Sequence, residues 1–299
     1  MLVFPKGNLP VYCAVGASNE KLAQRWVSAG ANCLFSYGDQ KRLVEIAENL
    51  GVGYALRVHT VQHMQSFIDS GYDPAFWWVL PDEWPSKHGD EPITWGAGGK
   101  ADIAFLKTFL KVKSNAPVFV YTPGHYSNVN GVQKAIRECA DVGCAALYDE
   151  SYGYAPSFAV WRLQETTHFC TYAVADCGID DRMLATGKRL NRNLWLSVMC
   201  GAKGLLLNNV ARAKAEHLSA FRDFVAEHSR IWHVIALGRF AKSTFDGELI
   251  SGMAMPTFEC PPVQRVWQYD FRLAEEFASI RVDLVDNSVS IKNWSTYGG

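Results

Sequence analysis

The sequence predicts an α/β protein, namely a (β/α)8 TIM barrel followed by a small all-β region. From residue 11 onward, short apolar runs alternate with amphipathic helical stretches, which is typical of βα units that build a parallel sheet. Several runs are continuously apolar rather than alternating, as expected for strands buried on both faces. We therefore assign residues 1–231 to the barrel and residues 232–299 to a β-strand-rich C-terminal region.

Eight apolar runs of strand length are expected to form the barrel. They are residues 11–17, 32–37, 54–59, 76–80, 118–121, 145–148, 169–175 and 204–208. Helices are expected at residues 19–27, 39–50, 61–70, 101–113, 132–142, 182–200 and 215–231. Gly30 and Gly51 follow the first two helices and are expected to end them.

The chain changes character after the last predicted helix. Short alternating runs predict the strands of the C-terminal region at residues 234–240, 248–255, 265–269, 278–287 and 288–293. A turn is expected at Asp286-Asn287. The connection at residues 85–100 is long and rich in Gly, Pro, His and Trp, and we interpret it as an active-site loop.

The composition narrows the classes of partner. Hydrophobic content of 48% with 20% charged residues is ordinary for a soluble globular protein, and a net charge of -1 gives no basic surplus for nucleic acid or an anionic membrane. Ten Trp, twelve Tyr and sixteen Phe exceed what a core requires, and several lie beside polar residues in loops. Exposed aromatic rings suit the flat apolar faces of sugars, so a neutral glycan is the expected partner.

Cysteine usage and the N-terminus bear on the compartment. The eight cysteines have no CxxC spacing and mostly fall in apolar runs, so we expect reduced core thiols and neither a zinc cluster nor a cofactor. Neither a signal peptide nor an 18-residue apolar stretch is visible, which makes a cytoplasmic location the default. Secretion after removal of a leader, and release by cell lysis, stay open. The sequence carries no indication of oligomeric state.

Two of the predicted strands end in adjacent carboxylates. The run 76–80 is followed by Pro81, Asp82, Glu83 and Trp84, and the run 145–148 is followed by Asp149 and Glu150. In an α/β barrel the residues that follow each strand converge at one end, so these pairs are expected to meet. A carboxylate in this position can also cap the helix that follows, and this alternative applies to each site.

Paired carboxylates beside aromatic rings fit hydrolysis of a glycosidic bond. One carboxylic acid protonates the leaving oxygen, and a second carboxylate attacks the sugar or activates water. The candidate catalytic carboxylates at the strand ends are Glu83, Glu150, Asp82, Asp149 and Asp176, and those that do not act directly would tune pKa values or orient the substrate. The expected substrate-binding residues at the strand ends and in the loops are Trp84, Trp95, His59, His125, Tyr126, Tyr152, Tyr154, Asn208 and Tyr37.

The segment Phe76-Trp77-Trp78-Val79-Leu80-Pro81-Asp82-Glu83-Trp84 resembles the fourth strand of TIM-barrel glycoside hydrolases, and Gly201-Ala202-Lys203-Gly204 resembles the turn before their eighth strand. The resemblance spans residues 11 to about 231 and names the superfamily without a particular family. It implies that Glu83 is the acid/base. The seventh strand ends in Asp176, where many such enzymes carry a nucleophilic Glu, so Glu150 or Asp149 after the sixth strand is favoured as the partner.

Three other functions remain open. A non-catalytic carbohydrate-binding barrel would use the same aromatic and acidic residues. A substrate-assisted N-acetylhexosaminidase would use Asp82 to orient the acetamido group of an amino sugar and Glu83 to donate the proton. A metal-dependent barrel hydrolase would need ligands such as His59, His63, His125 and Asp176. The leading hypothesis is a glycoside hydrolase acting on a neutral or amino-sugar-containing polysaccharide or oligosaccharide.

Overall fold

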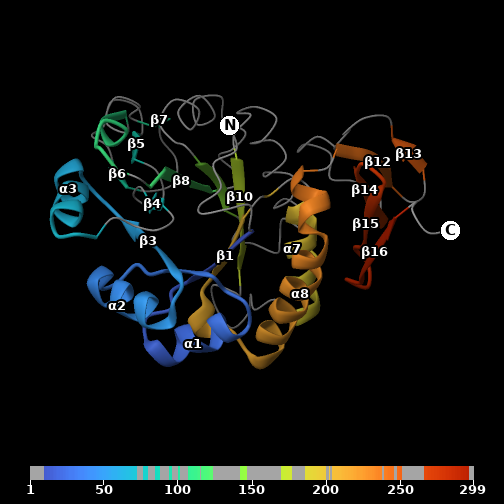
Figure 1. The fold of residues 1–299 in the computed structure, drawn as a ribbon, viewed down its shortest axis with the longest axis horizontal. Helices are drawn as coiled ribbons and strands as arrows, with labels where there is room; N and C mark the ends of the chain where they lie inside the picture. Colours follow the sequence, from blue (N-terminus) through green and yellow to red (C-terminus); the bar gives the residue numbers. More distant parts are fainter. Residues whose placement is uncertain are drawn as a thin grey trace.

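The structure is a computed structural model of the 299-residue chain. It describes residues 10–72, 77–79, 85–87, 94–95, 100–101, 107–114, 116–123, 142–146, 170–176, 186–199, 202, 204–237, 239–245, 248–250 and 266–295. Parallel strands form its centre, helices surround them, and an antiparallel sheet lies at one side (Figure 1). The predicted α/β class and the small C-terminal antiparallel region are therefore confirmed.

Eight parallel strands pair in a ring, in the order β1-β11-β10-β9-β8-β4-β3-β2, with β1 hydrogen-bonded to both β2 and β11. They are β1 (Val11–Val15), β2 (Cys33–Phe35), β3 (Gly53–Arg57), β4 (Trp77–Val79), β8 (Val118–Pro123), β9 (Val142–Ala146), β10 (Cys170–Asp176) and β11 (Gly204–Asn208). Each overlaps one of the eight apolar runs, although β9 begins three residues before the run 145–148 and shares only residues 145 and 146 with it. Because all the pairings are parallel, the carboxyl ends of the strands lie at the same end of the ring.

The described helices follow strands as expected for βα units. They are α1 (Glu20–Ser28), α2 (Gln40–Leu50), α3 (Val61–Asp69), α7 (Gly187–Met199) and α8 (Ala215–Leu237), with a short 3₁₀ helix η3 (Val210–Arg212) after β11. Gly51 ends α2 in a left-handed conformation (φ 66°), as predicted. Gly30 also has positive φ (111°), and a Cβ there would approach Val225 of α8 to 2.7 Å. Glycine therefore lets the turn after α1 pack against α8.

The C-terminal region is a five-stranded antiparallel sheet in the order β13-β12-β14-β15-β16. Its strands are β12 (Arg239–Phe245), β13 (Glu248–Ile250), β14 (Val266–Leu273), β15 (Glu276–Asp283) and β16 (Val289–Ser295). The predicted turn is present, because Asn287 adopts a left-handed φ of 59° between β15 and β16. The sheet packs on α7 and α8, which separate it from the parallel strands (Figure 1).

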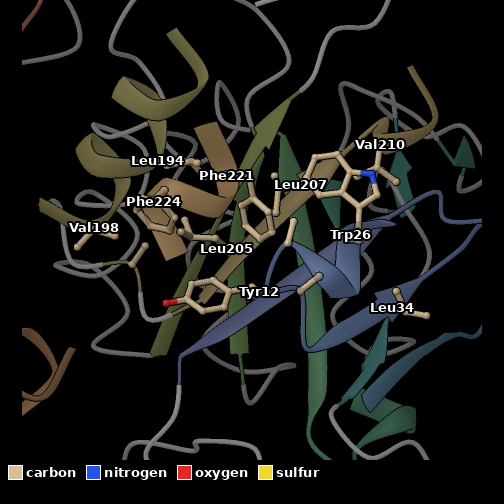
Figure 2. Packing of buried hydrophobic residues seen from close by; sticks show 14 of the residues in the cluster. Tyr12, Trp26, Leu34, Leu194, Val198, Leu205, Leu207, Val210, Phe221 and Phe224 are labelled. Carbon is tan, nitrogen blue, oxygen red and sulfur yellow. The ribbon is translucent and has the colours of Figure 1, made fainter. Parts of the chain in front are cut away.

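Aromatic side chains join the first strand to the last helix. Tyr12 of β1 contacts Phe221 and Phe224 of α8 edge-on, each at 6.1 Å between ring centroids, and its hydroxyl pairs with Nδ1 of His228 at 2.8 Å. Figure 2 shows these rings gathered with Leu205 of β11. Burial raises the pKa of Tyr12, so its hydroxyl stays protonated and available to this contact. The cluster anchors α8 where the ring of strands closes.

The structure differs from three expectations. Residues 234–237 belong to α8, because Val234, Ile235 and Ala236 bury the last turn of that helix rather than beginning a strand. The connection 85–100, expected to be a loop, contributes to a three-stranded antiparallel sheet of β5 (Pro85–Lys87), β6 (Thr94–Trp95) and β7 (Lys100–Ala101). Within the described part of residues 101–113, where a helix was expected, only residues 107–109 are helical. The helix expected at residues 132–142 lies outside the described residues, except for Val142, which begins β9.

Candidate active site

The inner surface of the ring can be assigned from the burial pattern. On β3 the side chains of Tyr54 and Leu56 belong to the core between the strands and the helices, whereas Ala55 does not. Neighbouring side chains on a strand point to opposite faces. Arg57, the last residue of β3, therefore shares the inner face with Ala55. By the same alternation Asn208, the last residue of β11, lies on the inner face because Leu205 and Leu207 face the helices.

On one side of β1, the end of β10 meets the end of β11. Asp176 pairs in register with Asn208, so a carboxylate residue and a carboxamide residue occupy neighbouring positions on the same face. Asn208 is buried, with 6% of its surface exposed. Asn209 follows it with a left-handed backbone (φ 55°) and turns the chain into η3. The sequence predicted both Asp176 and Asn208 as site residues, and the register brings these two together.

On the other side of β1, the ends of β2 and β3 form a second group. The guanidinium carbon of Arg57 lies 5.3 Å from the centre of the Tyr37 ring, and Tyr37 contacts Phe35 edge-on at 5.0 Å. Gln40, the first residue of α2, accepts a hydrogen bond from the backbone N–H of Arg57 at 3.0 Å and donates through Nε2 to the carbonyl of Gly38, also at 3.0 Å. This side chain ties the turn after β2 to the end of β3.

Arg57 is a site residue that the sequence reasoning missed. Its Nε is buried and has no hydrogen-bond partner. Leaving a buried donor unpaired in this way lowers the stability of the folded state by about 1–3 kcal/mol. The available signal was a single charged residue inside the apolar run Tyr54-Ala55-Leu56-Arg57-Val58. Periodicity within one strand does not show which of its faces is the inside of the ring, so that signal could not be interpreted from the sequence.

His59 stands two residues beyond Arg57, on the exposed approach to the same group. Its ring stacks on that of His63, with 5.9 Å between centroids and 4° between planes. Partial burial lowers the pKa of His59, and the positive charge of Arg57 and then the neighbouring His63 lower it further. Tyr37, which contacts Arg57, has 39% of its surface exposed. The predicted residues Tyr37 and His59 therefore lie close together around Arg57.

We expect NMR titration to give a pKa for His59 below the ordinary value for histidine. Arg57→Gln should raise that pKa, because it removes the charge that disfavours the imidazolium, whereas Arg25→Gln on the outer face of α1 should leave it unchanged. Because the folded pKa lies below the unfolded one, the unfolded chain binds the proton more readily. His59 therefore lowers stability as pH falls through the interval between the two pKa values, and this penalty is absent above it.

Some of the polar residues that follow strands are helix caps. Asn19 accepts a hydrogen bond from the backbone N–H of Leu22 at 2.9 Å at the start of α1. Asp39 accepts from the N–H groups of Lys41 and Arg42, at 3.0 and 3.1 Å, at the start of α2. The capping alternative thus holds after β1 and β2, where a polar residue stands in the same position as the proposed catalytic pairs.

The remaining predicted site residues are only partly covered by the structure. The backbone of Trp95 lies in β6, paired with Pro85 of β5. The residues that lie outside the described part of the chain are Asp82, Glu83, Trp84, His125, Tyr126, Asp149, Glu150, Tyr152 and Tyr154. Their roles stay predictions. The strands that lead into them, β4, β8 and β9, are present in the ring and end at the same edge as β3 and β11.

Two of the cysteines lie side by side in the ring of strands. Cys13 and Cys33 are buried free cysteines that pair in register on β1 and β2, in agreement with the prediction of reduced core thiols at these two positions. Within the described residues, no group of three or more His, Cys, Asp or Glu side chains is arranged to hold a metal ion. Across the same residues, none of the helices combines the length and apolar character needed to cross a bilayer.

Known proteins resemble this chain in fold and not in sequence. No protein-family model matches the chain. No curated protein matches it either. Solved structures superpose on it closely enough to define the fold. A maltogenic α-amylase from Thermotoga neapolitana aligns with a TM-score of 0.55 and 11% identity, over 94% of this chain and 87% of that one.

Two further solved structures agree with the first. A β-L-arabinopyranosidase from Geobacillus stearothermophilus gives a TM-score of 0.54 and 10% identity, over 92% of this chain and 84% of that one. An α-galactosidase from Lactobacillus brevis gives 0.54 and 9%, over 92% of this chain and 46% of that one. The chain thus has a fold like that of TIM-barrel glycoside hydrolases. At this level of identity the likeness identifies the fold and no family within that class.

Proposed function

We propose that this chain is a glycoside hydrolase that cleaves glycosidic bonds of a polysaccharide or oligosaccharide at the carboxyl ends of its barrel strands. The observation that carries the proposal is the ring of parallel strands, which gathers all the strand ends at one edge. There Asp176 and Asn208 are in register, and Tyr37, Arg57 and His59 lie at or just beyond the ends of the neighbouring strands β2 and β3. Active sites of such barrels lie at this edge. The fold shared with glycoside hydrolases supports the same reaction class.

In this proposal the complete architecture is a (β/α)8 barrel over residues 1–231 with an accessory β region over residues 232–299. Glu83, four residues after the end of β4, is the general acid/base, and Glu150, four residues after the end of β9, is its partner. Asp82, Asp149 and Asp176 adjust the pKa values of this pair through like-charge coupling. Asn208 bonds sugar hydroxyls, and the aromatic residues provide stacking surfaces. The reaction needs no cofactor, and the proposed location is the cytoplasm.

The wild-type chain tests this proposal directly. We expect it to release nitrophenol from one class of nitrophenyl glycoside in a panel covering both anomers of the common hexoses, pentoses and N-acetylhexosamines. Reducing-end assays on polysaccharides would extend the result. The configuration of the first product, followed by NMR, would show retention or inversion, which correspond to carboxyl separations of about 5–5.5 Å or 6.5–9.5 Å.

The competing functions give different results in the same panel. A carbohydrate-binding barrel would bind glycans in calorimetry and release nothing. A substrate-assisted N-acetylhexosaminidase would act only on substrates that keep the acetamido group. A metal-dependent hydrolase would lose turnover in EDTA and regain it when a divalent ion is restored. Absence of hydrolysis across the panel, from a chain that is folded by circular dichroism, would contradict the proposal.

A further inference from the structure

The side chain of Arg57 differs in its contacts from three other arginines in the described part of the chain. Arg42 and Arg230 are exposed and each meets a glutamate at 2.7 Å. Arg192 is buried, with 7% of its surface exposed, and donates to Asn287 at 2.6 Å and to Asn193. The guanidinium of Arg57 has no hydrogen bond or ion pair among the described residues, and its Nε is buried without a partner.

The position of Arg57 is fixed by its backbone rather than by its charge. Gln40 accepts from its N–H group, and it pairs in register with Val79 at the end of β4. The ring of Tyr37 covers one side of the guanidinium, leaving its N–H edge for another partner. The group is thus held on the inner face, at the edge where the strands end, beside the strand that leads to Glu83.

The positive charge of Arg57 affects a neighbouring side chain at this edge. Arg57 contributes to lowering the pKa of His59, so the guanidinium imposes a positive potential on its surroundings. The one acidic side chain on the adjoining turn, Asp39, is engaged by the backbone N–H groups of Lys41 and Arg42. A positioned cation with a buried donor left unpaired, and without a carboxylate in contact among the described residues, is suited to bind an anion at this edge.

We propose that Arg57 is the anion-binding residue of a glycan subsite, and that the preferred substrate carries an anionic group, either a uronic acid carboxylate or a sulfate ester. The inference rests on the proposed function and narrows its substrate class from neutral to acidic glycans. A guanidinium presents Nε–H and a terminal N–H side by side, which matches two oxygens of such a group. Binding would satisfy the buried Nε, while Tyr37 would hold the guanidinium plane in place.

Calorimetry with matched pairs of probes tests the inference. One pair is tetragalacturonate and its carboxyl-reduced form, and the other is a sulfated carrageenan tetrasaccharide and its desulfated form. We expect the wild-type chain to bind one charged member at least about tenfold more tightly than its neutral counterpart, the range for a hydrogen bond to a charged group. The pair that shows the difference identifies the anionic group. Added salt should weaken the charged member selectively.

Substitutions of Arg57 test whether this residue causes the preference for the charged probe. Arg57→Gln should abolish the difference in affinity within the pair by weakening binding of the charged member. Arg57→Lys should retain only part of the difference, because a lysine keeps the charge and loses the paired N–H donors. Arg25→Gln, an exposed change on α1, should behave as wild type. Thermal melts of all the variants show that each is folded.

The outcomes separate this inference from the proposed function. A charge preference that depends on Arg57 in a chain without hydrolytic activity would support the anion subsite and contradict the glycosidase. Hydrolysis of neutral glycans with no preference for either charged probe would support the glycosidase and overturn the anion subsite. A preference that persists in Arg57→Gln would also overturn it, since another group would then be binding the anion.

Discussion

Replacing Glu83 with glutamine is expected to lower kcat about 10²- to 10⁴-fold on glycosides with a poor leaving group, because glutamine cannot donate the proton that the leaving oxygen needs. The loss should be much smaller on 2,4-dinitrophenyl glycosides, whose leaving group departs without protonation. Stopped assays on both substrates, with the wild type and the variant side by side, measure the difference.

Glu150→Gln should lower kcat on both kinds of substrate, because a nucleophile or general base is required whatever the leaving group. Glu227→Gln is the matched control, since Glu227 is exposed on α8 and bonded to Arg230. It should retain wild-type turnover. Turnover of Glu83→Gln within twofold of the wild type on the poor leaving group would remove Glu83 from catalysis, and the capping role found for Asn19 and Asp39 would then be the better account of it.

Replacing Trp26 with alanine is expected to lower the free energy of unfolding by about 3–5 kcal/mol. Trp26 lies in α1 with 1% of its surface exposed and contacts the ring of Phe221 in α8 at 5.3 Å between centroids (Figure 2). Its removal leaves a cavity between the first and last helices, where the ring of strands closes. Urea unfolding followed by circular dichroism gives the change.

Trp294→Ala serves as the matched control for that measurement. Trp294 lies on the edge strand β16 with 44% of its surface exposed, and it stacks on Phe277 at 5.3 Å. It should lose only about 0.5–1.5 kcal/mol, the value of an aromatic pair. Equal losses in the two variants would show that Trp26 does not hold α1 against α8.

The strands were the most predictable part of this protein. Runs such as 204–208 are continuously apolar because a parallel strand in a ring is covered on both faces, and this pattern differs from that of an amphipathic helix. The run 234–240 was predicted less well, because residues 234–237 belong to α8 and only residues 239–240 lie in a strand, β12. A few consecutive apolar residues fit a buried strand or the buried end of a helix equally well, and here Val234, Ile235 and Ala236 are buried in the last turn of α8.

In the described part of the site, the identity of most residues could be predicted from the sequence, but their grouping in space could not. The residues Tyr37, His59, Asp176 and Asn208 could be proposed from sequence, because polar and aromatic residues after apolar runs stand out. Their grouping could not, since it depends on which strands become neighbours. The ring places Asp176 beside Asn208 and the Arg57 guanidinium over Tyr37, although the members of these pairs are separated by 32 and 20 positions in the chain.

The amino-acid sequence alone determined the α/β class, the approximate positions of the eight parallel strands, and the residues available for chemistry, because each depends on local periodicity and residue type. The tertiary structure decided which face of β3 is the inside, how residues 85–101 pair, and that Arg57 is a fixed cation without a counter-ion among the described residues. Those features depend on strand pairing and closure between segments far apart in the chain, and a local pattern cannot encode them.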